Sequence, residues 1–506
     1  MANIKHNIIA NYLGSGWTAL MSLLFIPLYI HYLGIEAYGL IGIFTMLQIW
    51  LSILDAGLTP TLGREMARFR GGVYTLQRIH ELVRALEWIF VIIAVAIILI
   101  VRLISPWLAS DWLKLEKLTP DVVENALAVS GVVIGSRWLA GLYRSGINGL
   151  QNQVSLNVII ALFATFRGLG VVLVLKYISP SIQVFFIYQA IIALIEAIFL
   201  REFMKHILSA PKAPVSFNIK ALKEVKRFAA GMITITIFAT ILTQADKLII
   251  SKLISLADFG HYALASSVAG GLYFIIQPLS NTIRPRLAEL VASEKSDQIS
   301  ISYHKFSQLI TLTIVPTALV IAVFSDHLML LWTRDIETTK ATALIITLLV
   351  IGNMLNGLMN APYALQLAFG KTRFAIWANF VAVVILIPGL LVSVQRYGTI
   401  AAPVVWVLLN TGYMLIIIPV MHKTILVKDM WLWYWKDVAF PALSALIVIA
   451  IFYLIAPSPD LNKPLVSILI LVFSGILSLL ASIFAAKHIR DELNILLVNF
   501  KFQLRN

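Results

Sequence analysis

The sequence predicts an all-α polytopic membrane protein, and its composition is the first reason. Of its 506 residues, 60% are hydrophobic and only 13% are charged, and the mean hydropathy is +0.90. Soluble domains carry about 25% charged residues. Apolar runs of about 20 residues, the length of a membrane-spanning helix, recur from one end of the chain to the other. The sequence contains no cysteine, which excludes disulfides, thiol catalysis and cysteine metal sites.

The apolar runs predict about fourteen transmembrane helices. The first run follows Met1–Asn7 without a small-residue cleavage site, so it is expected to be a retained span rather than a signal peptide. The expected spans lie near 8–32, 37–62, 83–104, 122–146, 155–176, 182–203, 227–254, 259–284, 303–331, 339–365, 374–394, 400–422, 437–456 and 464–486.

Lysine and arginine residues are unevenly divided between the loops that join these spans. About 27 of them lie on or near one side of the membrane and about 9 on the other, which predicts that both termini are cytoplasmic. The net charge of +14 therefore follows from topology, and no nucleic-acid partner is expected. The opposite loops are short, and none is long enough to hold a soluble catalytic domain.

The two halves of the chain share a pattern of polar residues. Tyr38–Gly39 opens the second predicted span, and Phe259–Gly260 opens the eighth. Because an even number of spans separates the two copies, they share one orientation and form a parallel repeat. The sequence thus predicts two six-helix lobes followed by two additional helices. The expected domains are an N-lobe with a basic linker at 1–226, a C-lobe at 227–424 and a C-terminal helix pair at 425–506.

Cationic residues inside the spans are the main functional signal. Arg137 and Arg144 lie seven residues apart on the fourth span, hence on one helical face, and Arg167 lies midway along the fifth. Lys247 and Arg284 belong to the other half. Each such residue costs about 3 kcal/mol at the centre of a bilayer. One hypothesis is a cationic, water-filled cavity between the halves that receives a phosphate or pyrophosphate group.

The competing interpretation assigns these cations to helix packing. They would then pair with acidic residues such as Glu196, or extend from the span ends toward the membrane surface. Asp55 is expected to face the cavity and either to bind a coupling cation or, as favoured here, to neutralise an arginine. Asp246 has the same two roles open to it. Its neighbour Lys247 points about 100° away on the helix, so the two are not expected to pair.

A stripe of amides lies on the tenth span, at Asn353, Asn356 and Asn360. It is equally suited to sugar hydroxyls and to hydrogen bonds between helices. The sequence contains no HExxH metal motif, no phosphate-binding glycine loop and no nucleophile elbow. No metal, cofactor or catalytic residue is therefore predicted.

Several short motifs carry a family resemblance. They are the segments 32–40, 55–58, 63–68, 244–250 and 259–265. Together they resemble polysaccharide-biosynthesis flippases of the O-antigen translocase type, which belong to the multidrug/oligosaccharidyl-lipid/polysaccharide exporter superfamily. The resemblance covers the whole chain in topology and about a quarter of it in recognisable motif.

The resemblance implies a function as well as a fold. It implies a bacterial inner-membrane protein that moves an undecaprenyl-pyrophosphate-linked oligosaccharide, such as an O-antigen repeat unit, from the cytoplasmic to the periplasmic leaflet. It further implies alternating access through a cationic central cavity, with the last two helices offering the lipid a path. The partners that the resemblance implies are the lipid-linked oligosaccharide and membrane lipids, and a polysaccharide polymerase with its chain-length machinery is a further candidate.

Two other functions compete with this one. A multidrug or cation antiporter of the same superfamily often places a carboxylate on the first span, whereas residues 8–32 contain no Asp or Glu. A membrane polysaccharide polymerase or glycosyltransferase would need a substantial outer loop or a cluster of loop carboxylates, and the sequence shows neither. The chain is therefore expected to be a transporter and not an enzyme.

Overall fold

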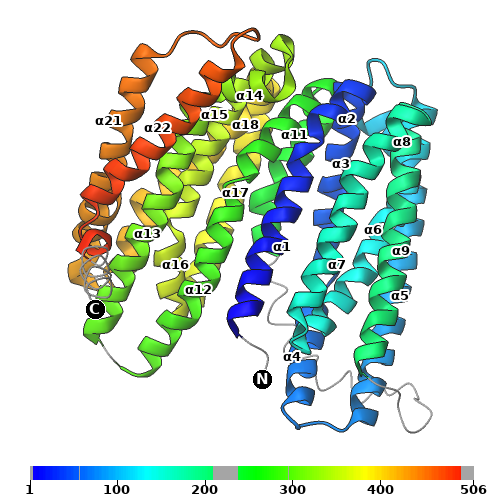
Figure 1. The fold of residues 1–506 in the computed structure, drawn as a ribbon, viewed down its shortest axis with the longest axis horizontal. Coiled ribbons are helices and arrows are strands. Elements are labelled where there is room, and N and C mark those ends of the chain that lie inside the picture. Colours follow the sequence, from blue (N-terminus) through cyan, green and yellow to red (C-terminus); the bar gives the residue numbers. More distant parts are fainter. Residues whose placement is uncertain (1–3, 56, 209–236, 295, 492–506) are drawn as a thin grey trace, which may run out of the picture. The chain divides into compact units, whose positions relative to one another are not determined.

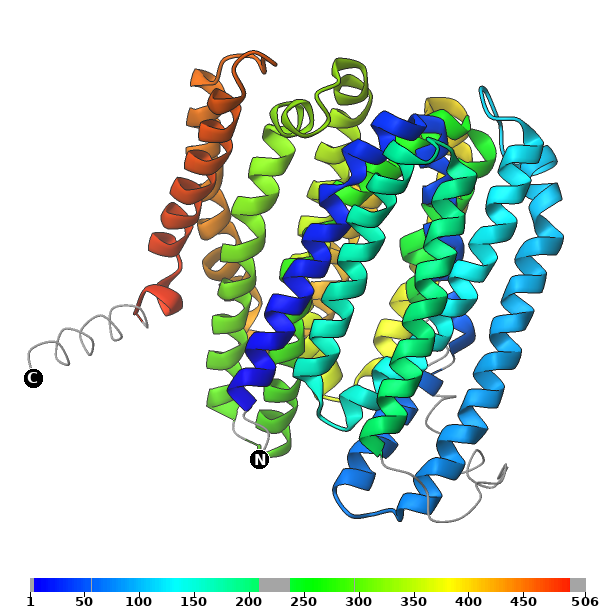
Figure 2. The same ribbon diagram turned by 45° about the vertical axis from the view of Figure 1, so that its right-hand side comes forward.

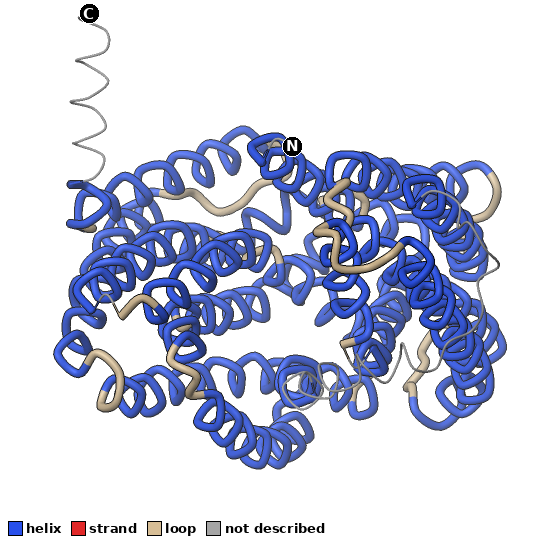
Figure 3. Tube along the Cα trace, turned by 90° about the horizontal axis from the view of Figure 1, so that it is seen from below, coloured by secondary structure: helices blue, strands red, loops and turns tan. Residues whose placement is uncertain are grey.

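The computed structural model describes residues 4–55, 57–208, 237–294 and 296–491, and within these ranges the chain is helical and contains no strand (Figures 1 and 3). Helices are expected in a bilayer, because hydrocarbon offers no hydrogen-bond partner and a helix pairs its own backbone groups. The predicted all-α fold class is confirmed. Contacts divide the chain into two compact units, residues 1–263 and 264–506, and each is described on its own.

The first unit is a bundle in which several spans are interrupted by short turns of altered helix. A π-helical turn, η3, interrupts the fifth span, and such turns widen the helix locally and often occur at functional sites. The elements of the unit are α1 (Ile4–Leu24), α2 (Ile26–Leu33), α3 (Ile35–Leu51), η1 (Ser52–Asp55), α4 (Leu58–Arg70), α5 (Leu76–Trp107), η2 (Leu108–Trp112), α6 (Pro120–Gly149), α7 (Gln153–Thr165), η3 (Phe166–Gly170), α8 (Val171–Tyr177), α9 (Ile182–Leu208), a helical segment at 237–253, and the start of α11 (Leu256–Gly270).

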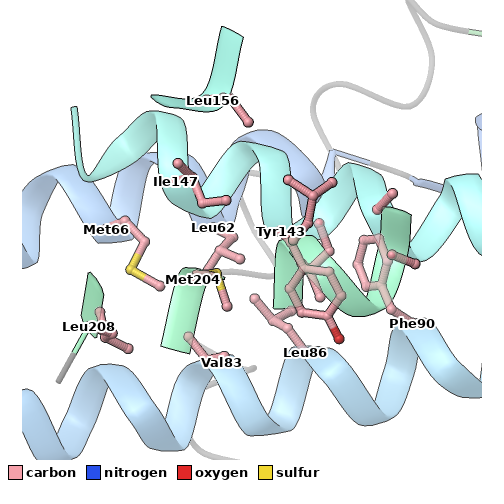
Figure 4. Close-up of a cluster of buried hydrophobic side chains, with 14 of the residues drawn as sticks. Leu62, Met66, Val83, Leu86, Phe90, Tyr143, Ile147, Leu156, Met204 and Leu208 are labelled. Atoms are coloured by element: carbon pink, nitrogen blue, oxygen red, sulfur yellow. The ribbon is translucent and has the colours of Figure 1, made fainter. Parts of the chain in front are cut away.

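Helix α6 is central to the first unit, because it packs along α4, α5 and α9. Helix α1 lies along α7 (Figures 1 and 2). A core of buried apolar side chains joins α4, α5, α7 and α9 to α6, and Met66, Phe90, Tyr143 and Met204 are among its members (Figure 4). This core holds α6 in place, and α6 carries two of the three cations predicted to be functional in this half.

The two copies of the predicted repeat meet at their glycines. A Cβ atom on Gly39 would lie 2.4 Å from the carbonyl oxygen of Leu256, and one on Gly260 would lie 2.3 Å from that of Ile35. Only glycine permits so close an approach of α3 and α11. Each glycine contacts the residue four positions before the other, and a two-fold axis produces such reciprocal contacts. This geometry agrees with a parallel repeat.

The second unit is built around α13, which packs against α12, α15, α21 and α22. Helices α21 and α22 lie side by side (Figure 1) and contact α13 through Val320, Phe324, Ile449 and Ile470. The elements of the unit are the end of α11, α12 (Tyr273–Ala292), α13 (Ser296–Val323), α14 (Ser325–Thr333), α15 (Ile336–Leu358), α16 (Asn360–Ala368), α17 (Thr372–Tyr397), η4 (Gly398–Ile400), α18 (Ala401–Gly412), η5 (Tyr413–Ile417), α19 (Ile418–His422), η6 (Val427–Asp429), α20 (Met430–Leu432), η7 (Trp433–Ala439), α21 (Phe440–Ile455) and α22 (Pro464–Ala485).

In the described ranges, 11 helices are long and apolar enough to cross a membrane, and the bent pair α11–α12 brings the number to 12. The longest of them, Ile376–His422, contains two of the predicted spans. They separate at Gly398, whose φ of +68° allows the chain to reverse, and α17 packs against α18. With the helical segment at 237–253, the predicted fourteen spans are consistent with the structure.

The predicted domain boundaries stay predictions. Most of the basic linker, and with it the boundary at 226/227, lies outside the described residues. The boundary at 424/425 lies inside the second unit, between α19 and η6.

Candidate functional site

Three arginines of the first unit gather around one cavity. The cavity has a volume of about 370 Å³, and Arg137, Arg144 and Arg167 all line it. Arg137 and Arg144 project from one face of α6, as their spacing predicts, and Arg167 projects from the π-helical turn η3. The structure thus brings together the three cations that the sequence places in this half.

Arg137 is held by neutral groups. Its Nη1 donates to Oε1 of Gln48 on α3 at 3.0 Å, and its Nη2 donates to Oε1 of Gln189 on α9 at 3.3 Å. The guanidinium carbon lies 5.3 Å from the ring centroid of Phe44, within the range of a cation–π interaction. The Nε of Arg137 is buried and has no hydrogen-bond partner in the described part of the chain. Within the described ranges, no carboxylate therefore forms an ion pair with this guanidinium.

Arg144 and Arg167 share one carboxylate. Each forms an ion pair with Glu196 on α9, Arg144 through Oε1 and Arg167 through Oε2. The Glu196 side chain is 0% exposed, whereas those of Arg144 and Arg167 are 33% and 16% exposed. Both arginines are thus still accessible from the cavity. Three guanidinium groups against one carboxylate leave an excess of two positive charges in this cluster.

The sixth span, helix α9, carries two matching polar residues, of which the sequence predicted only one. Gln189 and Glu196 lie seven residues apart on α9, as Arg137 and Arg144 do on α6, and the two pairs meet residue for residue. Glu196 was predicted as a pairing partner, but Gln189 was missed. The heptad spacing between the two was the available signal. Other polar groups that line the cavity are Thr18, Ser22, Tyr29 and Gln48.

Lys247 and Arg284 do not line this cavity. Lys247 pairs with its neighbour Asp246, since its Nζ lies 3.4 Å from Oδ2, so the prediction that the two do not pair was wrong. The long lysine side chain curls back and also donates to the carbonyl oxygen of Thr243 at 3.3 Å. Asp246 additionally accepts a hydrogen bond from the Tyr262 hydroxyl at 2.5 Å. Arg284 lies in the second unit, where its side chain is exposed.

Asp55 does not form the salt bridge that was favoured for it. Its Oδ1 accepts hydrogen bonds from the backbone N–H and the hydroxyl of Thr59, at 3.0 and 2.6 Å. In the part of the chain that the structure describes, no cation lies within salt-bridge distance of Asp55. The correction has a local cause, because an acid just before a helix satisfies free N–H groups of the first turn of α4.

The amide stripe of the tenth span is hydrogen-bonded within the second unit. Asn353 receives a hydrogen bond from Trp406 at 3.0 Å, and Asn356 donates to Asn410 at 3.0 Å, so α15 is tied to α18. Asn360 begins α16 and accepts from Ser280 of α12 at 3.0 Å. These are the hydrogen bonds between helices that the sequence predicted as one of two alternatives. The sugar-binding role stays a prediction.

A buried polar cluster in the second unit was not predicted from the sequence. His304 Nδ1 lies 2.5 Å from Oδ2 of Asp437, and Gln308 donates to Oδ1 of the same carboxylate at 2.9 Å. Tyr303 lies 3.1 Å from Nε2 of His422, which extends the network to α19. The cluster joins α13 to η7 and thus fastens the C-terminal helices to the rest of the unit. It lies in the second unit and shares no residue with the arginine cavity.

The motif at 63–68 lies in α4, after the second span, and forms a cluster of ion pairs around Glu65. Glu65 is 2% exposed and pairs with Arg64 at 2.6 Å and with Arg68 at 3.2 Å. Burial raises the pKa of Glu65, but hydrogen bonds from Tyr74 and Arg64 and the charges of Arg64 and Arg68 outweigh it. The pKa of this carboxyl therefore lies below its ordinary value. Another motif residue, Glu36, accepts backbone hydrogen bonds from residues 116–118 at 2.7 to 3.1 Å.

Comparison with known proteins agrees with the motifs. Residues 4–291 match the family described as "Polysaccharide biosynthesis protein", and residues 232–392 match the family described as "MatE". Two relatives bear the name "Putative O-antigen transporter". The one from Shigella flexneri is 21% identical over 74% of this chain and 87% of that protein. The one from Salmonella typhi is 23% identical over 62% of this chain and 70% of that protein.

Solved structures share the fold. The structure described as lipid II flippase MurJ in an inward closed conformation has a TM-score of 0.69 at 14% identity, covering 96% of this chain and 99% of that one. An inward-facing multidrug resistance transporter of the MATE family has a TM-score of 0.60 at 11% identity, covering 80% of this chain and 96% of that one. At these identities the likeness concerns the fold alone. With the sequence matches, it confirms the family resemblance predicted from the motifs.

Proposed function

We propose that this chain, which belongs to the polysaccharide biosynthesis protein family, is a flippase that carries a lipid-linked oligosaccharide across the bacterial inner membrane. The family match and the relatives named as O-antigen transporters support this class of substrate. The fold shared with a lipid II flippase supports the same kind of transport. The chain is a multi-pass membrane protein, and we place both of its termini in the cytoplasm on the strength of the loop charges.

The single observation that carries the substrate proposal is the excess of positive charge around the cavity of the first unit. Among the described residues, Glu196 is the one carboxylate that pairs with Arg144 and Arg167, and the side-chain hydrogen bonds of Arg137 go to amide oxygens. Charges in such a location are costly unless an anion or water compensates them. A diphosphate carries the missing negative charge, and planar guanidinium groups bind its oxygens with paired hydrogen bonds.

The three arginines have different roles in this proposal. When Arg137 binds a phosphate oxygen, it gives up hydrogen bonds to the neutral amides of Gln48 and Gln189. This costs less free energy than breaking an ion pair with a carboxylate. Arg144 and Arg167 keep Glu196 as a shared partner and offer their remaining N–H groups to the same anion. The cavity volume of about 370 Å³ lies within the range of ligand sites. We infer that the diphosphate binds here during alternating access.

The antiporter of cationic drugs is disfavoured by the same observation. A cavity with an excess of two positive charges repels a cation, and residues 8–32 contain no carboxylate to attract one. The fold alone does not separate the two functions, since multidrug transporters share it. We therefore assign the substrate by the charge of the cavity.

The test is transport by the purified chain in liposomes. Fluorescent polyprenyl-diphosphate oligosaccharide is placed in both leaflets, and a membrane-impermeant reductant bleaches the outer pool. We expect the inner pool to become bleachable at a rate that depends on the protein, and a polyprenyl sugar without the diphosphate to remain protected. Uptake of a cationic dye, with no movement of the diphosphate lipid, would contradict the proposal and support an antiporter.

A further inference from the structure

A second and larger cavity lies on the first unit, away from the arginine cluster. It has a volume of about 1020 Å³ and shares no lining residue with the arginine cavity. Helices α5 and α9 form its walls, and Leu139 and Tyr143 of α6 contribute to its floor. We call it the α5–α9 groove.

The groove has one apolar part and one charged part. Trp88 and Val91 of α5 and Leu194 and Ile198 of α9 line it, and all four side chains are exposed. Exposed apolar side chains on membrane-spanning helices face acyl chains. On α5 the apolar residues follow the charged ones in the sequence, and on α9 they precede them. The two helices are therefore antiparallel, and their charged residues lie at the same end of the groove.

The charged part contains one cation more than it has acids. Arg201 lies 3.2 Å from Glu87 and 3.3 Å from Glu202, and Lys205 lies 2.9 Å from Glu202. Both acids are thus engaged by Arg201 and Lys205. Arg84 is exposed, and in the described ranges it has no hydrogen-bond or ion-pair partner. The uncompensated charge of the groove therefore lies at Arg84.

The distance between the two parts fits an amphipathic molecule. From Arg84 to Val91 the helix rises about 10 Å at 1.5 Å per residue. A phosphate at Arg84 would therefore place the first segment of an acyl chain beside Trp88 and Val91. The charged part also lies at the end of the spans that carries most of the lysine and arginine residues, and basic pockets at that end bind anionic lipid headgroups.

We propose that the α5–α9 groove holds one anionic glycerophospholipid of the adjacent leaflet. The phosphate contacts Arg84 and Lys205, and one acyl chain lies along Trp88, Val91 and Ile198. The lipid is a bound partner and not the transported substrate, because this groove and the arginine cavity share no residue. Its presence would steady α6, which contributes both to the floor of the groove and to the arginine cluster.

The test uses the indole of Trp88 as a reporter. The chain contains 12 tryptophans, so the signal of Trp88 is obtained as the difference between the parent and a Trp88→Phe variant. Both are reconstituted in zwitterionic bilayers that contain either brominated phosphatidylglycerol or brominated phosphatidylcholine. We expect the anionic lipid to quench Trp88 at a lower mole fraction than the zwitterionic one.

Removing charge from the groove should remove this preference. We expect Arg84→Gln and Lys205→Gln each to lower the relative affinity for the anionic lipid about fivefold. Arg102→Gln is the matched control, because it removes one exposed charge from the same helix near its other end and should leave the preference unchanged. Equal quenching by the two lipids, or a preference that survives both variants, would overturn the proposal. Absence of quenching by either lipid would also overturn it, since the groove would then be closed to lipid.

Discussion

Replacing Arg137 with alanine tests the proposed role of the arginine cavity most simply. In the structure Arg137 donates to two amide oxygens, at 3.0 and 3.3 Å, and forms no ion pair with any residue that the structure describes. The substitution leaves two neutral acceptors without a donor, which costs about 1–3 kcal/mol each if no water replaces it. In the complex it removes hydrogen bonds from a charged donor to a phosphate, which contribute about 1.5–3 kcal/mol. We therefore expect a loss of affinity for the diphosphate lipid of about 10- to 150-fold.

The assay for this prediction is the liposome bleaching experiment at several substrate concentrations, with protein levels matched by in-gel fluorescence. The affinity of Arg137→Lys for the diphosphate lipid should lie between those of the parent and Arg137→Ala, because lysine keeps the positive charge but lacks the planar guanidinium that donates two parallel hydrogen bonds. Arg102→Ala is the control, since Arg102 is an exposed arginine of α5 paired with Glu124 at 2.9 Å. Unchanged affinity and rate in a well-folded Arg137→Ala variant would refute the reasoning.

Three further predictions concern groups that the structure pairs. Glu196→Gln frees two arginines at once, so thermal unfolding should shift down while the affinity for the diphosphate lipid rises, and a fall in affinity would show that Glu196 itself positions the ligand. Asp437→Asn weakens the hydrogen bond to His304, so limited proteolysis should cut the chain between α19 and α21 sooner than in the parent. An unchanged cleavage pattern would mean that apolar contacts alone hold α21 and α22 against α13. Because the pKa of Glu65 is lowered in the folded chain, its contribution to stability is present above the unfolded pKa of about 4.3 and is lost as pH falls through the lower folded pKa. Glu65→Gln should therefore lower the unfolding temperature at pH 7 and flatten its fall below pH 5, and a parallel pH profile would contradict this.

The fold class and half of the candidate site follow from the sequence because hydrocarbon penalises charge. Arg137, Arg144 and Arg167 stand out in apolar runs, and helical spacing predicts that the first two share a face. Gln189 gives no such signal, since an uncharged amide in a span is common and its partner is 52 positions away in the chain. The pairing of His304 with Asp437, 133 positions apart, depends on tertiary packing that no local pattern encodes.

Two errors have local causes. Lys247 pairs with Asp246 because a side chain with four rotatable carbons can curl back past its own helix, which helical angles do not describe. Asp55 was assigned to an arginine because helical spacing places it on the polar stripe of the second span, but α3 ends at Leu51 and the carboxylate binds Thr59 at the start of α4. For Lys247 helical spacing does not describe the reach of the side chain, and for Asp55 the helix on which the spacing was counted is interrupted between Ser52 and Gly57.

The most direct measurement of the central proposal is the charge dependence of ligand binding. Polyprenyl sugars with a diphosphate, a monophosphate or no phosphate are titrated onto the purified parent chain and onto the Arg137→Gln/Arg144→Gln/Arg167→Gln variant. The proposal predicts that the parent binds the diphosphate most tightly and the uncharged sugar most weakly, and that the variant binds all three alike. The proposal would be contradicted if the affinity of the variant still followed the charge of the three ligands. It would also be contradicted if the affinity of the parent did not.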